Sequence, residues 1–410
     1  MAIPTSTDLA PFLKTEYLDK WEIYNWGSSF YDTCTKEYSD PTDLAFTMQG
    51  SLETGFGGGY TAISSGNDTL ADHGNPTGVL ITITPAKLTQ RVSLPHEIFK
   101  LADTNVKAFG NLVDQRMKGA MNNLKRHVSR QFFGSHFGHL AQTGTGATST
   151  TIPVNAATIV TGVNIGKIFS VGDQIDVYTA LTAGTQEVTG ATITAVNTAA
   201  NTLTVTPSQT FGTASYIFFK NCRGKEVYGL PEGIDNGSGF TDSYFGNVRS
   251  TNAQLQSTVD STAVAPSAAL FNALINTSMN ESTVTDMFCS TNVRTKVAND
   301  LITAQVRFDV DPNRGIKNIN TSYNDVVLNN GVIVHADQWC QNTTAYLFNR
   351  EYLKLYVPST MKQPDFMDED GNKLSRIADK LALEATLVWY LQLVMVRGNA
   401  GVKKTALTGV

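Results

Sequence analysis

The stretch HEIFKLADTNVKAFGNLVDQRMKGAMNNLKRHVSRQFF, residues 96–133, decides how the rest of the chain is arranged. Its apolar residues recur at spacings of three and four, which places them along one face of an α-helix. From Asp103 to Phe133 such a helix would hold about 30 residues and measure roughly 45 Å, well beyond the usual ~11–12 residues. Gly134 follows as a stop signal. The sequence therefore predicts a long spine helix with this apolar face in the core: Ile98, Leu101, Ala102, Val106, Phe109, Leu112, Val113, Met117, Ala120, Met121, Leu124, Val128 and Phe132.

The composition limits the classes of protein that the chain can belong to. At 410 residues it should hold two or three domains. It has 31 Lys and Arg against 36 Asp and Glu, so it lacks the basic excess of a dedicated nucleic-acid binder. Only 16% of residues are charged, against a typical ~25%. Low charge suits a protein that buries much of its surface against neighbouring subunits, although secreted β-rich proteins share this composition.

Neither a signal peptide nor a membrane span is expected. The N-terminus lacks a basic segment followed by an apolar run, and the apolar segment at 387–396 is too short to cross a bilayer. The four cysteines are widely spaced and form no CxxC pair. Free thiols made in a reducing cytosol are therefore expected.

Two segments precede the spine. Residues 1–50 are rich in aromatic side chains without lasting periodicity, and their rings could pack on the chain itself or on a neighbouring subunit. Residues 51–94 begin with the glycine-rich GFGGGY at 55–60, and VLITITPAKLTQRV at 79–92 alternates like a strand. The glycine run lacks the spacing of either nucleotide-binding loop. A long extended hairpin or loop is predicted here.

After the spine the composition changes sharply. Five runs at roughly ten-residue spacing look like strands: TIPVNAATIV, DQIDVYTA, EVTGATITAV, NTLTVTP and YIFFKN. Residues 142–222 are therefore predicted to form an inserted small all-β domain, a sandwich or a barrel, without a catalytic constellation. From 260 to 410 helical and strand patterns alternate only partly, with a helix at 266–279, a strand at 285–290 and a helix at 292–304. This favours a mixed α+β fold.

The chain offers no local motif for catalysis or metal binding. His136 and His139 are separated by glycine-containing sequence and have no acidic or Cys partner nearby, which favours packing roles. The DVDPN run at 309–313 resembles a calcium loop, but Arg314 stands where glycine is needed. The DEDGN run at 368–372 fails in the same way. We expect no catalytic residue, no metal and no cofactor; an enzyme whose site is assembled from distant residues stays an alternative.

The order of these parts resembles the major capsid proteins of tailed bacteriophages, which have the HK97-type fold. Two stretches sharpen the resemblance: LKRHVSRQFFGSHFGHLA at 124–141 looks like the exit of the spine helix, and YGLPEGIDNG…YFGNVRST at 228–251 is similar to a connecting segment. The resemblance implies an α+β HK97-like capsid fold with these parts: 1–50 N-terminal arm, 51–94 E-loop, 95–141 spine helix of the P-domain, 142–222 inserted β-domain, 223–264 P-domain connecting segment, 265–345 A-domain, and 346–410 return strands of the P-domain.

The same resemblance implies a structural protein of the virion. It would assemble with itself, as hexamers and pentamers, into an icosahedral shell that encloses double-stranded DNA, in the host cytoplasm. A portal, a separate scaffolding protein and a decoration protein are the implied partners, with no membrane. The alternatives are a tail-tube subunit, which should lack the spine helix, and a β-rich adhesin, which should carry a secretion signal.

Two groups of residues are candidates for contacts in such a shell. A long glycine-hinged loop offsets its conformational entropy only when it lies on another chain. The candidate intersubunit residues are therefore Gly55, Gly57, Gly58, Gly59 and Tyr60. Basic residues of the spine could contact packaged DNA without sequence specificity, form intersubunit ion pairs, or simply face solvent: Lys125, Arg126 and Arg130.

Overall fold

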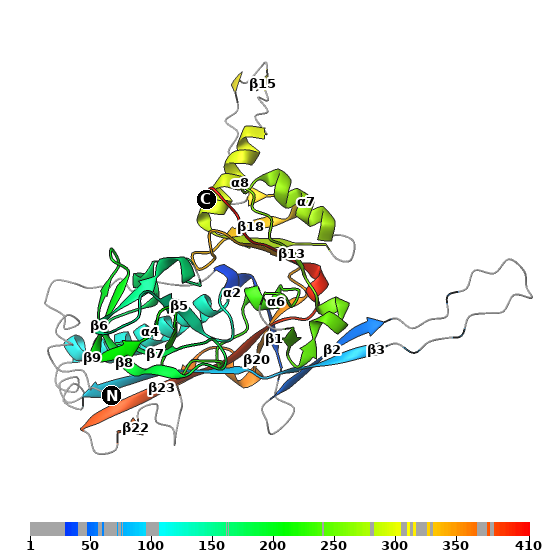
Figure 1. Cartoon of the computed structure of the whole chain (residues 1–410). Coiled ribbons are helices and arrows are strands. Elements are labelled where there is room, and N and C mark those ends of the chain that lie inside the picture. Colours follow the sequence, from blue (N-terminus) through cyan, green and yellow to red (C-terminus); the bar gives the residue numbers. More distant parts are fainter. Residues whose placement is uncertain are drawn as a thin grey trace, which may run out of the picture.

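A computed structural model of the chain shows a larger lower body, a smaller upper body above it, and a β-hairpin that projects from the lower body (Figure 1). The predicted mixed α+β class is confirmed. The structure describes residues 29–39, 47–55, 60, 72, 75, 77–95, 106–160, 162, 164–239, 242–278, 283–304, 310–311, 315–316, 326–328, 331–366, 375–377 and 381–410.

The predicted spine helix is confirmed as α4 (Val106–Gln131), 26 residues long. The expected start near Asp103 lies outside the described residues. Along the second half of α4, the predicted apolar stripe is buried at Ala120, Leu124 and Val128. The Gly134 N–H closes the helix end by donating to the Gln131 carbonyl at 3.0 Å.

The lower body is built on one long strand, β23 (Ala382–Met395). The spine helix packs on β4 (Ala86–Pro95), which pairs antiparallel with β23 from Ala382↔Pro95 to Leu391↔Ala86. The last ten residues or so of the segment predicted as a loop thus belong to the lower sheet. The other strands of this sheet are β1 (Thr35–Tyr38), β20 (Leu353–Val357), β21 (Asp365–Phe366) and β22 (Ser375–Arg376).

A closed β-barrel lies where the sequence predicts a small all-β unit. Its order is β10-β5-β6-β9-β8-β7, with every neighbouring pair antiparallel. The barrel interior is continuous with the core of the lower body, because Ile152 and Ile193 share one apolar cluster with Leu124 and Val128 of the spine. The strands are β5 (His139–Thr143), β6 (Ala147–Asn155), β7 (Gln174–Tyr178), β8 (Gln186–Asn197), β9 (Thr202–Phe211) and β10 (Tyr216–Phe219).

The upper body is a six-stranded mixed sheet in the order β13-β24-β19-β14-β18-β17. The helices α7 (Ala268–Ser278) and α8 (Thr291–Ala304) pack on it, as the patterns at 266–279 and 292–304 predict. Two strands, β13 and β24, come from outside the segment predicted as one domain at 265–345. The strands are β13 (Thr258–Asp260), β14 (Asp286–Cys289), β17 (Val326–Val327), β18 (Ile333–Ala336), β19 (Ala345–Phe348) and β24 (Gly401–Lys404).

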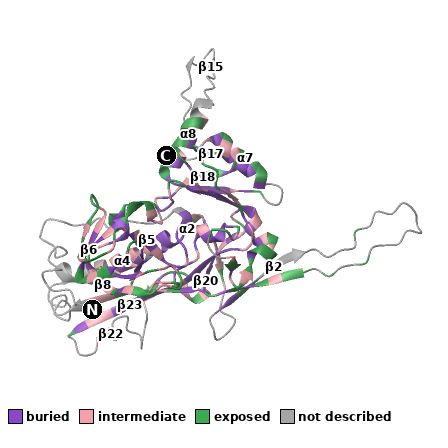
Figure 2. Cartoon of the chain, in the orientation of Figure 1, coloured by how far each residue is buried: buried purple, intermediate pink, exposed green. Residues whose placement is uncertain are grey.

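The upper sheet separates two apolar cores, because successive side chains of a strand point to opposite faces. Met287 and Leu347 face the helices and belong to the upper core. Phe288 and Phe348, their neighbours along β14 and β19, belong to the core of the lower body. Figure 2 shows the buried residues concentrated along this sheet and along β20 and β23. The two bodies therefore meet through aromatic side chains.

Short elements lie between these larger ones. They are α2 (Ser29–Thr33), η2 (Ala156–Thr158), α5 (Ile165–Ile168), α6 (Leu230–Gly233), β11 (Ser243–Tyr244), β12 (Asn247–Val248), η3 (Arg249–Thr251), η4 (Ala253–Leu255), η6 (Ser359–Met361) and η7 (Gly398–Ala400). A small β15–β16 pair (Val310–Asp311, Gly315–Ile316) extends beyond α8 (Figure 1).

Candidate functional site

The projecting hairpin is the first candidate surface. It consists of β2 (Met48–Gly55) and β3 (Thr77–Ile83), paired antiparallel from Met48↔Ile83 to Gly55↔Thr77. At its base, Met48, Ile81 and Ile83 are buried in one cluster with residues of the lower body. The outer part of β3 is exposed (Figure 2), and the Leu80 side chain is 55% exposed.

Hydrogen bonds from the lower body hold the base of the hairpin. The Asn247 Nδ2 donates to the Leu80 carbonyl at 3.0 Å, and the Gln392 Nε2 donates to the Thr84 carbonyl at 3.3 Å. The chain itself therefore fixes the direction in which the hairpin projects. Of the predicted loop residues, Gly55 ends β2 and Tyr60 is 93% exposed, whereas Gly57, Gly58 and Gly59 lie outside the described residues.

The predicted basic residues of the spine do not form one surface. Lys125 is exposed, but the Arg126 guanidinium donates to the Lys167 carbonyl in the barrel segment. Arg130 is buried, and its Nη2 lies 2.5 Å from the Glu226 Oε1, with the two side chains 4% and 2% exposed. The charge of Arg130 is thus paired inside its own chain, which leaves Lys125 as the exposed residue among the three candidates.

The basic segment of the spine instead attaches the barrel to the helix. Positions four apart lie on one helix face, and Arg126 and Arg130 both point at the barrel side. The His127 ring packs edge-on against Phe219 of β10 at 5.0 Å, and the Arg130 guanidinium lies 5.6 Å from the same ring. Burial, with the nearby Arg130 and Arg126, lowers the pKa of His127 to about 3, so its ring is neutral at pH 7.

A network of buried charges joins the end of the spine to the C-terminal strand. Glu232 of α6 accepts the His136 N–H at 2.9 Å and lies 2.7 Å from the His136 Nδ1. Asp235 pairs with the Lys403 ammonium of β24, and its Oδ2 lies 3.8 Å from the Arg249 Nη1. Burial lowers the pKa of Lys403, while Asp235 opposes this shift. Breaking such a buried pair is costly because it leaves one charge unpaired.

These contacts explain the two stretches that carried the resemblance. Glu232 and Asp235 come from YGLPEGIDNG, Arg249 comes from YFGNVRST, and His136 comes from the spine exit. Glu226, Lys403 and Lys404 belong to no motif that the sequence offers, yet all three are buried.

A second charged cluster lies at the start of β14, an interior strand of the upper sheet. The Asp286 Oδ1 accepts from the Arg350 Nη2 at 2.6 Å and lies 2.9 Å from the His335 Nε2. The Thr285 hydroxyl donates to the Asp286 Oδ2 at 2.7 Å. Burial alone would raise the pKa of the Asp286 carboxyl, but hydrogen bonds from His335, Arg350 and Thr285 lower it to about 2.

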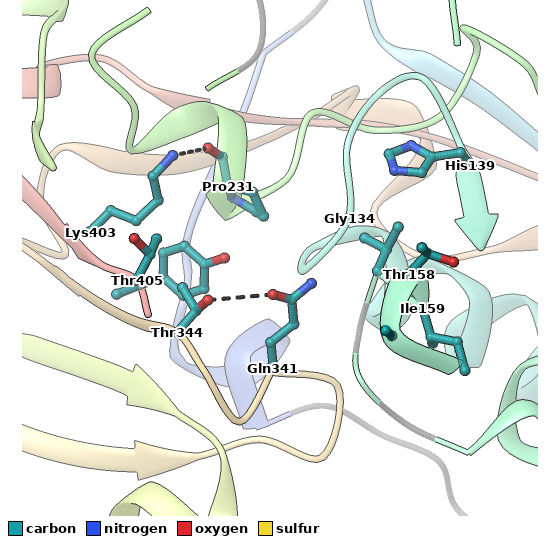
Figure 3. A pocket seen from close by; sticks show the side chains of 12 residues that line it. Gly134, His139, Thr158, Ile159, Pro231, Gln341, Thr344, Lys403 and Thr405 are labelled. Carbon is teal, nitrogen blue, oxygen red and sulfur yellow. Dashed lines mark hydrogen bonds between the residues drawn. The ribbon is translucent and has the colours of Figure 1, made fainter. Parts of the chain in front are cut away.

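A pocket of about 290 Å³ lies where the barrel, α6 and the upper sheet meet (Figure 3). On one wall the Thr344 hydroxyl donates to the Gln341 Oε1 at 3.4 Å, and the Lys403 Nζ donates to the Pro231 carbonyl at 3.0 Å. On the other wall His139 has its pKa lowered to about 4, by burial and then by Arg130. The walls combine uncharged polar groups with an ammonium already bound to the chain.

Grouped metal-binding side chains and membrane-spanning helices are both missing from the described part of the chain. Within it, no three His, Cys, Asp or Glu side chains are grouped to hold a metal ion. Likewise, none of the described helices has the length and apolarity to span a membrane. The four cysteines, which lie in described segments, are free thiols, as the sequence predicts.

Solved structures superpose on the chain over nearly its full length. A chain of the Cyanophage A-1(L) capsid asymmetric unit superposes with a TM-score of 0.57 at 12% identity, covering 98% of this chain and 99% of that chain. The chain has the fold of a phage capsid protein. The capsid of a native GTA particle gives a TM-score of 0.50 at 7% identity, covering 96% of this chain and 94% of that one.

The prediction of a capsid fold is therefore confirmed. No protein-family model and no curated protein sequence matches the chain. At 12% and 7% identity, the similarity to these capsid structures concerns the course of the backbone. The contacts of single residues are those of this chain's own structure.

Proposed function

We propose that the chain is the major capsid protein of a tailed bacteriophage, with a structural rather than a catalytic role. It would assemble with itself, as hexamers and pentamers, into an icosahedral shell around double-stranded DNA, in the host cytoplasm. The observation that carries the proposal is the capsid fold over nearly the full length of both chains compared. The spine helix also argues against the tail-tube alternative.

The segments of the chain take these proposed roles. Residues 1–50 act as the N-terminal arm and 51–94 as the E-loop, whose hairpin lies on an adjacent subunit. The spine helix and the lower sheet form the P-domain, and the upper body forms the A-domain. The exposed outer part of β3 supports the role of the hairpin, because the described residues of its own chain leave Leu80 largely uncovered.

The barrel is proposed to be an insertion in the minimal capsid fold. Its strands form a closed unit between the end of the spine and the connecting segment at 223–264. Because Arg126, His127 and Arg130 attach it to the spine, we expect it to move with the lower body as one piece. It is a candidate surface for a decoration protein.

Partners other than the chain itself also remain proposals. A portal and a separate scaffolding protein follow from the family resemblance. Lys125 is the candidate for weak phosphate contact with packaged DNA, since Arg126 and Arg130 are engaged inside the chain. Such a contact would weaken with rising salt concentration.

The proposal is tested with the hairpin. Leu80→Asp adds a charge on the exposed face of β3, and Val171→Asp adds the same charge at a barrel position that is 68% exposed. Both changes should leave the melting temperature nearly unchanged, because more than half of each side chain is exposed. Light scattering after size-exclusion chromatography should show assembly for the wild type and Val171→Asp, and its loss for Leu80→Asp. Equal assembly of both variants would contradict the proposed role of the hairpin.

A further inference from the structure

Residues 30–38, called the clasp here, lie at the junction of the two bodies. They comprise most of α2 and the strand β1. Phe30 is fully buried, and its ring is surrounded by aromatic rings from both bodies. It contacts Phe132 at 5.2 Å and Phe133 at 5.6 Å, at the end of the spine. It also contacts Phe288 at 5.1 Å and Phe348 at 6.2 Å, on the lower face of the upper sheet.

The clasp is fixed to the lower body by its own contacts. β1 pairs in parallel with β20, from Thr35↔Lys354 to Tyr38↔Val357. The Tyr31 ring packs edge-on against Trp389 of β23 at 5.6 Å. An ion pair between the Lys354 Nζ and the Glu37 Oε2, at 3.3 Å, adds a charged contact. Contacts with the lower body alone are therefore enough to hold Phe30 in place.

A second set of contacts joins the clasp to the upper body. The Thr35 hydroxyl donates to the Arg350 carbonyl at 3.1 Å, and the Arg350 guanidinium binds Asp286 of β14. His335, which also binds Asp286, is the cross-strand partner of Phe288 and stacks on its ring at 4.6 Å, so it flanks the aromatic cluster. One short segment thus contacts the spine, the lower sheet and the upper sheet.

We propose that the clasp sets the angle between the upper body and the spine, with Phe30 as the positioning residue. Well-packed aromatic clusters have few alternative arrangements of similar energy, because interiors are close-packed. Phe30→Ala shortens the side chain to a methyl group and removes the ring that packs between the end of the spine and the upper sheet. The Phe133–Tyr346 ring contact and the Lys403–Asp235 ion pair remain, so we expect the junction to loosen while the two bodies stay attached.

The angle is measured with two spin labels, on Lys125→Cys of the spine and Ala273→Cys of α7. Both positions are exposed, and Cys222, the one partly exposed native thiol, is replaced by serine. Labelled chains are diluted into unlabelled chain, so only distances within one chain are recorded. The wild type should give one narrow distance distribution. Phe30→Ala should broaden or shift it, and Phe30→Leu should do so to a lesser degree.

Phe271→Ala is the matched control, because Phe271 is equally buried but belongs to the upper core alone. It should lower the melting temperature without changing the distance distribution. A wild-type distribution in folded Phe30→Ala would overturn the proposal, and so would equal broadening in Phe271→Ala. If Phe30→Ala does not fold, Phe30→Leu decides by the same criterion.

The consequence for shell geometry rests on the proposed function. If the chain forms shells, Phe30→Leu should widen the distribution of shell diameters seen by electron microscopy, whereas Phe271→Leu should not. Failure of the wild type to form shells would count against the proposed function alone, because the distance measurement needs no assembly. Uniform shells from Phe30→Leu would overturn the link between the clasp and shell curvature.

Discussion

Removing one partner of the Arg130–Glu226 pair should be strongly destabilising. The pair is almost completely shielded from water, with the side chains 4% and 2% exposed, so Arg130→Met leaves a buried carboxylate without its cation. Breaking such a pair costs about 3–5 kcal/mol. The Glu226 Oε2 has no hydrogen-bond partner among the described residues, so the wild-type pair is incompletely satisfied. We therefore expect a loss of stability near the lower end of this range.

The expected change in melting temperature follows from the size of the chain. An unfolding entropy of about 2.1 cal/mol/K per residue gives roughly 0.9 kcal/mol/K over 410 residues, so the variant should melt about 3–6 °C lower. Lys125→Met, five positions earlier on the exposed side of α4, should change the melting temperature by less than about 1 °C, as usual for surface substitutions. Differential scanning fluorimetry can distinguish the melting temperatures of the two variants.

The pH dependence gives a second check on the same pair. Burial raises the pKa of the Glu226 carboxyl, while Arg130 opposes the shift. Without Arg130 the folded-state pKa rises further, and the folded state then binds a proton more readily than the unfolded chain. Stability is therefore retained below the unfolded pKa of about 4.3 and falls as the pH rises through the folded-state pKa.

Arg130→Met should thus lose more stability at pH 8 than at pH 4.5. The double variant Arg130→Met/Glu226→Leu should recover most of the loss, because it removes both charges. A deficit that is independent of pH, together with no recovery in the double variant, would refute the ion-pair reasoning. It would point to lost packing against Phe219 instead.

Three further predictions concern other parts of the chain. Asp286→Asn should cost about 1–3 kcal/mol at pH 7 by weakening charged hydrogen bonds. Because the Asp286 pKa is lowered to about 2, the stability of the wild type should fall as the pH drops from about 4 to 2. Thermal melts should show a smaller fall in the variant. Ile81→Ala at the hairpin base should cost about 2–5 kcal/mol and speed amide exchange in β2 and β3, whereas Thr82→Ala, exposed on the same strand, should do neither. Burial raises the pKa of all four thiols, so the native chain should react slowly with a thiol reagent at pH 8: Cys34, Cys222, Cys289 and Cys340. Cys222, which is partly exposed, should react before the buried cysteines. Unfolding should make all four react fast.

Local periodicity was enough to predict the main elements. The spacing of Leu124 and Val128 predicts the spine helix, and the helical pattern at 266–279 predicts α7. The short runs between 142 and 222 predict the strands of the barrel. In each case the signal comes from neighbouring residues, so no knowledge of distant contacts is needed.

Contacts between distant segments could not be predicted in the same way. Arg130 looks like a surface residue until Glu226, 96 positions later, is placed beside it. The strand β24 joins the upper sheet by pairing with β19 and β13. Its own sequence, GVKK, predicts neither partner. Phe30 has the same limitation, because its role depends on aromatic rings from three separate segments.

The most direct test of the central claim is electron microscopy of the purified full chain, expressed alone and with its proposed scaffolding protein, after size-exclusion chromatography. The capsid-protein account predicts closed shells, or hexamers and pentamers of several hundred kilodaltons. A stable monomer or dimer under both conditions would contradict it.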